Sequence, residues 1–600
     1  MSQYQAPLAE MQFVMSELAG LDQVATLPGF EEADPDVVSA VLDEAAKFAT
    51  NVLDPLNWPG DQEGAKRLDD GTVRTPAGFR DAYWQFCENG WNGLGKSTEF
   101  GGQGLPQLVA TAVEEMWHAS NMAFDLCPLL TQGAIEAIEL NGSDALKQTY
   151  LHKMVAGVWT GTMNLTEPQA GSDLAAVRTR AVPQGDGTYR IYGQKIFITY
   201  GEHDYTENIV HLVLARTPDA PEGVKGISLF VVPKFLVNAD GSLGERNDAH
   251  CVSIEHKLGI HASPTCVMAF GDHGGATGWV VGEENRGLEY MFVMMNLARF
   301  SVGMEGVGLG DRAYQRAVAY ARDRVQGKAV GTDKGAKAGP IIDHPDIRRM
   351  LMTMRACTEA ARAVAYVTAA AMDNAHRHPD AAARKRHQAF VDLMIPIVKG
   401  HSTEVAQKTA SLGVQVHGGM GFIEETGAAQ HLRDARISTI YEGTTGIQAN
   451  DLIGRKTARD GGATAHAVSG EIDKVAAELS AHVDANLKAI GRSLADANAA
   501  LKRAIDWVVP AYGAHPRAAH AAAVPYLELW GTVAGGWQLG RGALAAAKHL
   551  AAGTGDARFL HAKIVTARFY ADAILPQAAS LTATIAQAGD STLALAAEQF

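Results

Sequence analysis

One segment in the second half of the chain carries residues suited to acid–base chemistry. In residues 433–448, RDARISTIYEGTTGIQ, Glu442 follows an apolar stretch and stands directly before Gly443. A glycine leaves room for a substrate to approach the carboxylate, and a carboxylate removed from water is a stronger base. The segment therefore indicates Glu442 as a candidate general base.

Two segments further upstream have the composition of a site for a flat, polar ring. Residues 163–173, MNLTEPQAGSD, can offer backbone N–H groups and hydroxyls to such a ring, although a capped turn uses the same residue types. Residues 195–199, KIFIT, are typical of a strand, and strand alternation puts Phe197 and Thr199 on one face. That face is suited to stacking on a heterocycle and bonding to it; a plain core strand is the alternative.

Other catalytic signatures are absent from the sequence. Gly303, Gly306, Gly308 and Gly310 lack the spacing of a dinucleotide-binding turn and lie in a helical pattern, so we interpret them as sites of close helix packing. There is no Walker A loop, no His-Glu-x-x-His and no Gly-x-Ser-x-Gly. The 21 histidines show no convincing ligand spacing with carboxylate or Cys partners, so we expect no metal site.

The candidate residues must be positioned by elements whose character changes along the chain. Periodicity predicts helices, then short strands, then helices again, and finally Ala-rich helices after a loop at 457–466. Because strands and helices do not alternate, we do not expect a doubly wound sheet. We divide the chain into an N-terminal extension (1–35), an N-terminal helical domain (36–159), a central β domain (160–282), a C-terminal helical bundle (283–456) and an additional Ala-rich helical domain (457–600).

Composition narrows the functional class. The 600 residues include 52 Lys and Arg against 67 Asp and Glu, and the net charge of -15 argues against a nucleic-acid partner. Five scattered cysteines without a Cys-x-x-Cys pair favour a reducing compartment. We see no secretory signal, no apolar stretch of about 18 residues and no peroxisomal tripeptide, so we expect a cytoplasmic bacterial protein with no transmembrane segment.

In their order and spacing, seven strings resemble one family, the flavin-dependent acyl-CoA dehydrogenases, over about residues 36–456. They are STEFGGQGLP, LTEPQAGSD, GQKIFIT, KLGIHASPT, GEENRGL, QVHGGMGF and RDARISTIYEGTTGIQ. The resemblance implies a multidomain α+β fold with an N-terminal helical domain, a central β barrel and a C-terminal helical bundle, and with FAD between them. Residues 457–600 would then be an extra C-terminal helical domain.

The resemblance also implies a reaction. Glu442 matches the family's base, which removes the α-proton of an acyl-CoA thioester while a hydride leaves the β-carbon for flavin N5. The backbone N–H of Glu442 and a flavin ribityl hydroxyl would hold the thioester oxygen, and such a donor contributes about 3 kcal/mol to lowering the barrier. Exclusion of water should raise the pKa of Glu442. Some members carry the base just before the Arg matched by Arg299, where this chain has Ala298.

Motif positions assign further residues to the cofactor and the substrate. The flavin ring or phosphates would be contacted by Met163, Leu165, Thr166, Gly171, Ser172, Phe197 and Thr199, and the pyrophosphate by Thr444 and Gln448. The adenine end of a neighbouring subunit's FAD would be contacted by Gln415, Gly418, Gly419 and Arg324. The substrate would be contacted by Ser172, Arg299, Tyr441 and Gly443. The chain departs from the family in having Phe197 for Trp, Gln169 for Gly and a shortened string after Arg324.

The block beyond residue 456 points to a long bacterial subgroup, whose substrates are fatty acyl-CoAs or 3-methylmercaptopropionyl-CoA. Family members with this block tend to be dimers, so we expect a homodimer in which the extra helices cover a would-be subunit interface. Electron-transfer flavoprotein would accept the electrons. Two alternatives stay open: an acyl-CoA oxidase, which gives its electrons to oxygen, and a non-catalytic interaction scaffold that keeps the fold.

Overall fold

The structure is a computed structural model that describes residues 3–333, 335 and 337–600. The chain forms two compact units, which we describe separately. The helical unit comprises Met1–Ala46, Pro106–Ala119 and Val302–Phe600, and the sheet unit comprises Lys47–Leu105 and Ser120–Ser301. Three helices have residues in both units: α3 (Pro35–Phe48), α6 (Gln107–Asn141) and α8 (Gly287–Asp323).

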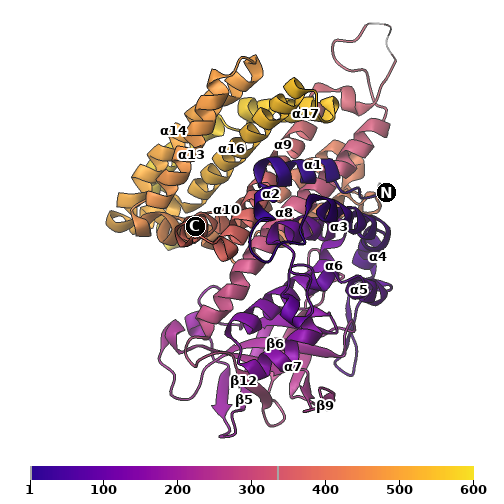
Figure 1. The fold of residues 1–600 in the computed structure, drawn as a ribbon, viewed down its shortest axis with the longest axis vertical. Coiled ribbons are helices and arrows are strands. Elements are labelled where there is room, and N and C mark those ends of the chain that lie inside the picture. The colour runs from indigo at the N-terminus through magenta and orange to yellow at the C-terminus, as the bar shows by residue number, and fades with distance from the viewer. Residues whose placement is uncertain (1–2, 334, 336) are drawn as a thin grey trace. The chain divides into compact units, whose positions relative to one another are not determined.

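An eight-stranded sheet forms the centre of the sheet unit (Figure 1). Its order is β10-β11-β5-β12-β7-β6-β3, with β4 paired to β5; β3 and β6 run parallel and the other pairs antiparallel. Apolar and β-branched residues favour these strands, and β6, NIVHLVLA, is buried along its whole length. The strands are β3 (Trp159–Asn164), β4 (Arg180–Pro183), β5 (Tyr189–Thr199), β6 (Asn208–Ala215), β7 (Ser228–Pro233), β10 (Ala249–Ile254), β11 (Thr265–Phe270) and β12 (Ala276–Val280).

Shorter elements complete the sheet unit. Two small antiparallel pairs, which the sequence patterns did not predict, are β1 (Lys66–Arg67) with β2 (Val73–Arg74) and β8 (Phe235–Val237) with β9 (Leu243–Arg246). The helices of this unit are α4 (Asp54–Glu63), α5 (Phe79–Glu88) and α7 (Asp144–Val155).

Long helices pack closely in the core of the helical unit. Helix α8 runs beside α10 (Ala381–His417) with glycines at the contact: a Cβ on Gly303 would come within 2.6 Å of Val398 Cγ1, and one on Gly306 within 2.5 Å of the Ser402 carbonyl oxygen. The interpretation of these glycines as packing sites is therefore confirmed. The other helices of this core are α1 (Leu8–Phe13), α2 (Leu21–Val24), α9 (Pro345–Arg377), α11 (Ala428–Ser438) and α12 (Thr445–Asp451).

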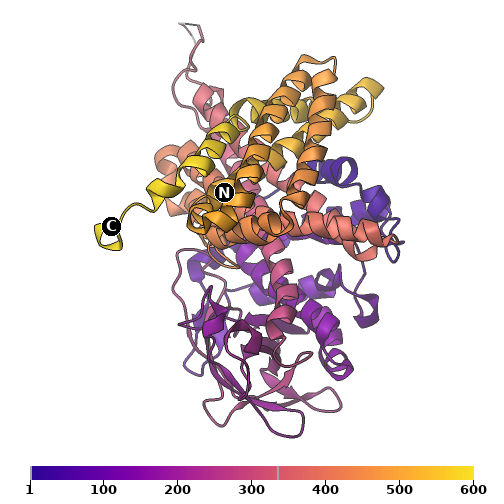
Figure 2. The same cartoon turned by 90° about the vertical axis from the view of Figure 1, so that its left-hand side faces the viewer.

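The Ala-rich block forms a helical layer of the same unit, and its longer helices lie side by side (Figures 1 and 2). Its loop is shorter than predicted, because left-handed Gly462 ends the turn and the first helix begins at Ala463. Helix α16 packs against α10 through Gly531, where a Cβ would meet the His401 ring at 2.0 Å. The helices are α13 (Ala463–Ala481), α14 (Ala485–Ala514), α15 (Pro516–Ala521), α16 (Ala523–Ala552), α17 (Ala557–Ala573), α18 (Gln577–Gln587) and α19 (Gly589–Thr592).

A buried ion triad joins three distant parts of the helical unit. Lys563 on α17 donates to Glu10 on α1 at 2.6 Å and to Glu359 on α9 at 2.7 Å. All three side chains are buried. The N-terminal extension and the Ala-rich block are thus fixed to the same core helix.

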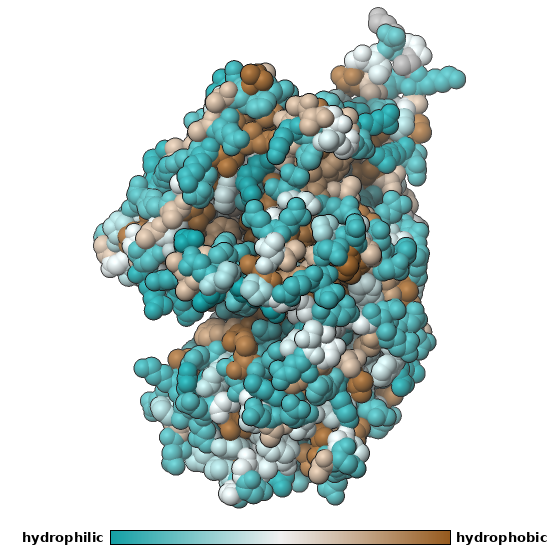
Figure 3. All heavy atoms as spheres, in the orientation of Figure 1, coloured by the Kyte–Doolittle hydropathy of each residue, from teal (hydrophilic) through white to brown (hydrophobic). Residues whose placement is uncertain are grey.

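Hydrophilic residues cover most of the visible face, and apolar residues are scattered among them (Figure 3). Within the described part of the chain, no helix combines the length and the apolar character needed to cross a bilayer.

Candidate functional site

The candidate base lies on a short loop of the helical unit, between α11 and α12. Glu442 has φ of +52°, one of five non-glycine residues with positive φ among those described. A residue with a long side chain rarely adopts this left-handed conformation, which persists where the surroundings enforce it and is concentrated at functional sites. Gly443 follows with φ of +88°. The loop is therefore sharply and specifically folded at the candidate base.

A buried lysine on α10 binds two backbone carbonyls of this loop. Lys399 on α10 is fully buried, and its ammonium donates to the carbonyl oxygens of Ser438 at 2.8 Å and of Gly443 at 2.7 Å. These two carbonyls flank Glu442 along the chain. Burying an ammonium costs several kcal/mol unless it is well bonded, so this arrangement is a strong constraint on the loop.

Residues of α12 hold the loop from its other end. The side-chain amide of Gln448 donates to the Glu442 carbonyl oxygen at 3.0 Å, and the Thr444 hydroxyl accepts the Ile447 N–H as the N-cap of α12. The Gln448 Oε1 atom is buried without a hydrogen-bond partner among the described residues. Gln448 thus binds the candidate base's own peptide, a contact that its expected place near a pyrophosphate did not predict.

A buried carboxyl group lies beside the loop. Glu305 on α8 is fully buried and hydrogen-bonds to the Tyr441 hydroxyl through Oε1, while its Oε2 has no partner in the described part of the chain. Burial raises its pKa to about 8, although His118, Tyr441 and Lys399 oppose the shift. The Tyr441 hydroxyl proton is therefore engaged by Glu305.

In the sheet unit, the two predicted ring-binding segments lie next to each other. The Ile196 N–H donates to the Thr166 carbonyl oxygen at 2.9 Å, which joins β5 to the segment after β3. Met163 lies in β3 and Leu165 follows it; Leu165 is buried, whereas Gly171 and Ser172 are exposed farther along the segment.

The alternation predicted for β5 is broken at Phe197. The pairing with β11 shifts register between Cys266 and Met268, and Phe197 has φ of +59°. Such a bulge bends the strand and redirects side chains. The regular strand on which the alternation argument relied is therefore interrupted at Phe197, and the shared face of Phe197 and Thr199 stays a prediction. The bulge leaves the Phe197 side chain 59% exposed in a strand that is otherwise buried or half-buried around it.

A second buried lysine holds the segment that begins at Met163. Lys195 on β5 donates to the Leu165 carbonyl oxygen at 3.0 Å and to Glu167 Oε1 at 2.8 Å. Burial alone would raise the pKa of Glu167, but Lys195 together with bonds from Thr179 and the Arg178 N–H lowers it to about 2. Burial lowers the pKa of Lys195 to about 8.

The remaining candidates lie on or just after α8 and α10. Arg299 on α8 is buried and contacts Asn296 and the Phe292 ring within the sheet unit. Gln415, Gly418 and Gly419 are exposed around the end of α10. His417, at the same helix end, stacks on Tyr320 with ring centroids 4.4 Å apart. Exposed Arg324 follows Tyr320 by four residues. Gln415 lies about 24 Å farther along α10 than Lys399, at the rise of an α-helix. These adenine candidates are therefore remote from the Glu442 loop.

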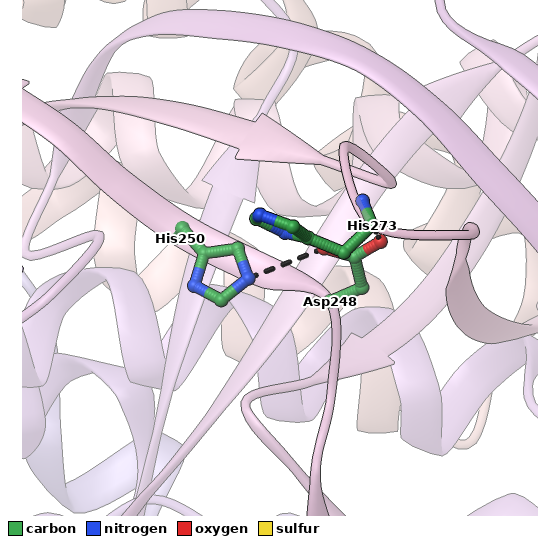
Figure 4. A group of neighbouring side chains, drawn as sticks. All are labelled: Asp248, His250 and His273. Atoms are coloured by element: carbon green, nitrogen blue, oxygen red, sulfur yellow. Dashed lines mark hydrogen bonds and ion pairs between the residues drawn. The ribbon is translucent and has the colours of Figure 1, made fainter.

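The sheet unit also groups three ligand-type side chains that sequence spacing did not reveal (Figure 4). Asp248 Oδ1 lies 3.2 Å from both His250 Nε2 and His273 Nδ1, and its Oδ2 accepts the backbone N–H groups of His273 and Gly275. These hydrogen bonds fix the turn between β11 and β12. They account for the grouping without a metal ion.

Sequence reasoning missed the residues that support the candidates. Lys399 and Glu305 stand alone in apolar helical runs, PIVKG and VGMEGVG, and an isolated charge in such a run was the available signal. Glu167 and Lys195 lay inside quoted motifs, but only the structure pairs them.

Models of one protein family match nearly the whole chain. The acyl-CoA dehydrogenase N-terminal, middle and C-terminal domains match residues 38–158, 162–273 and 285–456, and a domain described as acetyl-CoA dehydrogenase C-terminal like matches residues 468–596. A 3-methylmercaptopropionyl-CoA dehydrogenase from Ruegeria pomeroyi is 52% identical over 98% of this chain and 99% of its own. The chain belongs to the acyl-CoA dehydrogenase family. The expected oxidoreductase class and the expected fold with its extra C-terminal domain are confirmed.

Two further acyl-CoA dehydrogenases are similar to this one over nearly its full length. The broad-specificity linear acyl-CoA dehydrogenase FadE5 from Mycobacterium tuberculosis is 35% identical over 96% of each chain. The structure of an acyl-CoA dehydrogenase from Bacillus anthracis, complexed with FAD, covers 98% of this chain and 92% of its own with a TM-score of 0.72 at 21% identity.

The family binds FAD, as the sequence led us to expect, and the residues of this acyl-CoA dehydrogenase fit that cofactor. An exposed aromatic side chain, Phe197, is held in a strained conformation beside the polar segment that follows β3. Aromatic faces and backbone polar groups are the elements that bind a flat ring with polar edges.

Proposed function

We propose that this chain oxidises the Cα–Cβ bond of an acyl-CoA thioester to a trans-2-enoyl-CoA, with Glu442 as the base. The observation that carries the proposal is the left-handed backbone of Glu442 on a loop bonded at both flanks to Lys399. Strain that buried contacts maintain is characteristic of active sites. Glu442 takes the α-proton, and its backbone N–H donates to the thioester oxygen, where negative charge develops.

The family motifs give the cofactor and substrate contacts in this proposal. FAD supplies the hydride acceptor when bound. Phe197 and the segment from Met163 to Ser172 hold its ring and phosphates, with Thr444 and Gln448 nearer the pyrophosphate. Gln415, Gly418, Gly419 and Arg324 contact the adenine end in a neighbouring subunit, and their distance from Lys399 along α10 supports this separate role. Arg299, Ser172, Tyr441 and Gly443 contact the substrate.

We propose 3-methylmercaptopropionyl-CoA or a fatty acyl-CoA as the substrate, and electron-transfer flavoprotein as the electron acceptor. The 52% identity to a 3-methylmercaptopropionyl-CoA dehydrogenase supports the first substrate, and the 35% identity to a broad-specificity linear acyl-CoA dehydrogenase supports the second. The five free cysteines support the proposed cytoplasmic location. Helix α16 of the Ala-rich block packs on α10, as expected if the extra helices cover a would-be subunit interface, and this packing supports a homodimer. Light scattering tests the dimer, and a tetramer would contradict it.

An anaerobic titration of the flavin-loaded enzyme with both classes of acyl-CoA tests the activity, because flavin reduction bleaches its absorbance. Glu442→Gln should bind acyl-CoA and leave the flavin oxidised, with a loss of 10²- to 10⁴-fold or more in the reduction rate. Exposed Glu425→Gln is the matched control and should react like the wild type. Reduction of Glu442→Gln at the wild-type rate would show that the base is another residue.

Reoxidation distinguishes the alternatives. Reduced enzyme should pass electrons to electron-transfer flavoprotein much faster than to oxygen. Rapid peroxide formation without another acceptor would instead identify an acyl-CoA oxidase. Purified protein that binds no flavin would support a non-catalytic scaffold.

A further inference from the structure

The ammonium of Lys399 donates to peptide carbonyls on both sides of Glu442. Its partners are the Ser438 carbonyl at 2.8 Å, at the end of α11, and the Gly443 carbonyl at 2.7 Å, directly after Glu442. One buried group therefore fixes the orientation of two peptide planes that bracket the base. We call these two bonds of Lys399 the bracket. By fixing the two peptide planes, the bracket sets the direction in which the Glu442 side chain projects from the backbone.

We propose that Lys399 is a positioning residue for Glu442, and that Glu305 completes the support by binding the Tyr441 hydroxyl. This inference rests on the proposed role of Glu442 as the base. Neither supporting residue would touch the reacting atoms; both act through the loop.

The strained backbone explains why such support is needed. Glu442 has φ of +52°, a conformation that an L-residue leaves unless its neighbours hold it there. Three elements hold it: α10 through Lys399, α12 through Gln448, and α8 through Glu305 and Tyr441. Proton abstraction requires the base within hydrogen-bond reach of the substrate, and a displacement of about 1 Å can cost about 100-fold in rate.

The charges around Glu305 are consistent with Glu305 binding Tyr441 while Lys399 binds the loop carbonyls. It faces His118 and Glu114 of α6, Lys399 of α10 and the Tyr441 hydroxyl. Its pKa of about 8 leaves the group mostly neutral at pH 7, so it does not draw the Lys399 ammonium away from the two carbonyls. Glu305 can thus hydrogen-bond to the Tyr441 hydroxyl while Lys399 keeps its bonds to the Ser438 and Gly443 carbonyls.

The test compares two substitutions of buried lysines in the flavin-loaded enzyme. Lys399→Met removes the bracket, and Lys563→Met removes an equally buried lysine that binds Glu10 and Glu359 instead. We expect Lys399→Met to slow flavin reduction about 100-fold and to accelerate amide exchange in residues 439–448. Lys563→Met should lower the unfolding temperature without changing loop exchange or the reduction rate per bound flavin.

Milder variants keep the proposal testable if Lys399→Met does not fold. Lys399→Arg keeps two donors for the carbonyls and should lie between wild type and Lys399→Met. Tyr441→Phe removes the bond to Glu305 and should accelerate loop exchange with a smaller rate loss than Lys399→Met. Unchanged loop exchange in the Lys399 variants, or flavin reduction within threefold of wild type, would overturn the positioning role. If instead Glu442→Gln reduces flavin normally, the base assignment fails, while loop exchange still reports on the bracket itself.

Discussion

Lys195 in the sheet unit and Lys399 in the helical unit are both fully buried, and each donates to a backbone carbonyl in a segment expected at the active site. They differ in how the buried charge is stabilised. Lys195 is paired with the carboxylate of Glu167, whereas Lys399 is bonded to two carbonyl dipoles. Lys195 holds its segment through one carbonyl and one carboxylate, whereas the two carbonyl bonds of Lys399 set the orientation of two peptides.

The largest expected effect comes from breaking the charge pair in the sheet unit. Lys195→Met leaves Glu167 buried without its counter-ion and should cost about 3–5 kcal/mol of unfolding free energy. Urea unfolding measures the loss, and Arg286→Ala, which removes an exposed pair with Glu289, is the control with less than about 1 kcal/mol. A loss of that small size for Lys195→Met would mean that the pair does not anchor the segment.

A smaller, pH-dependent effect is expected at Glu305 in the helical unit. Its folded pKa of about 8 lies above the ordinary value of 4.5, so the folded state binds the extra proton between these pH values and loses stability as pH rises. Because glutamine does not titrate, the Glu305→Gln variant does not lose stability in this way as pH rises. Between pH 6 and 7.5, the wild type should therefore lose up to about 1.4 kcal/mol per pH unit relative to the variant. Parallel stability profiles would contradict the raised pKa.

The strained residue of the sheet unit should give an effect of about 1 kcal/mol. At φ of +59°, Phe197→Gly relieves left-handed strain that Phe197→Ala retains. We expect the glycine variant to be more stable than the alanine variant by about 1 kcal/mol in thermal unfolding. The reverse order would show that the bulge does not strain the backbone.

The smallest effect is expected at the cap of α12. Thr444→Ala removes the hydroxyl that accepts the Ile447 N–H and should cost about 0.5–1 kcal/mol, whereas Thr444→Ser should be nearly neutral. Amide exchange at the start of α12 measures this local loss. Equal exchange in the two variants would show that the hydroxyl does not cap the helix.

Periodicity and glycine spacing predicted the order of the elements well. The long helix through Gly303 and Gly306 and the strand-rich middle region follow from apolar patterns that repeat over many residues. The loop position of Glu442 was also readable, because its glycine neighbour and its motif are local in sequence.

Features that depend on a single residue or on distant partners were not predictable. The bulge at Phe197 interrupts a strand whose residue types favour regular alternation, so the sequence pattern did not predict it. Lys399 and Ser438 are far apart in sequence, and nothing in either local pattern specifies their bond. The supporting contacts of an active site are therefore harder to predict than the residue they support.

The triad of Lys563, Glu10 and Glu359 has a consequence for biosynthesis. A nascent chain that ends before residue 563 holds the two carboxylates without the cation that lies between them in the finished fold. Burying Glu10 in that state is unfavourable, since an unpaired buried charge is strongly destabilising, whereas Glu359 keeps its pair with Arg355. The helical unit therefore completes its core only after the ribosome has delivered α17, although its first helix emerges at the start of synthesis. Truncation within the Ala-rich block should expose the incomplete core to proteases and aggregation.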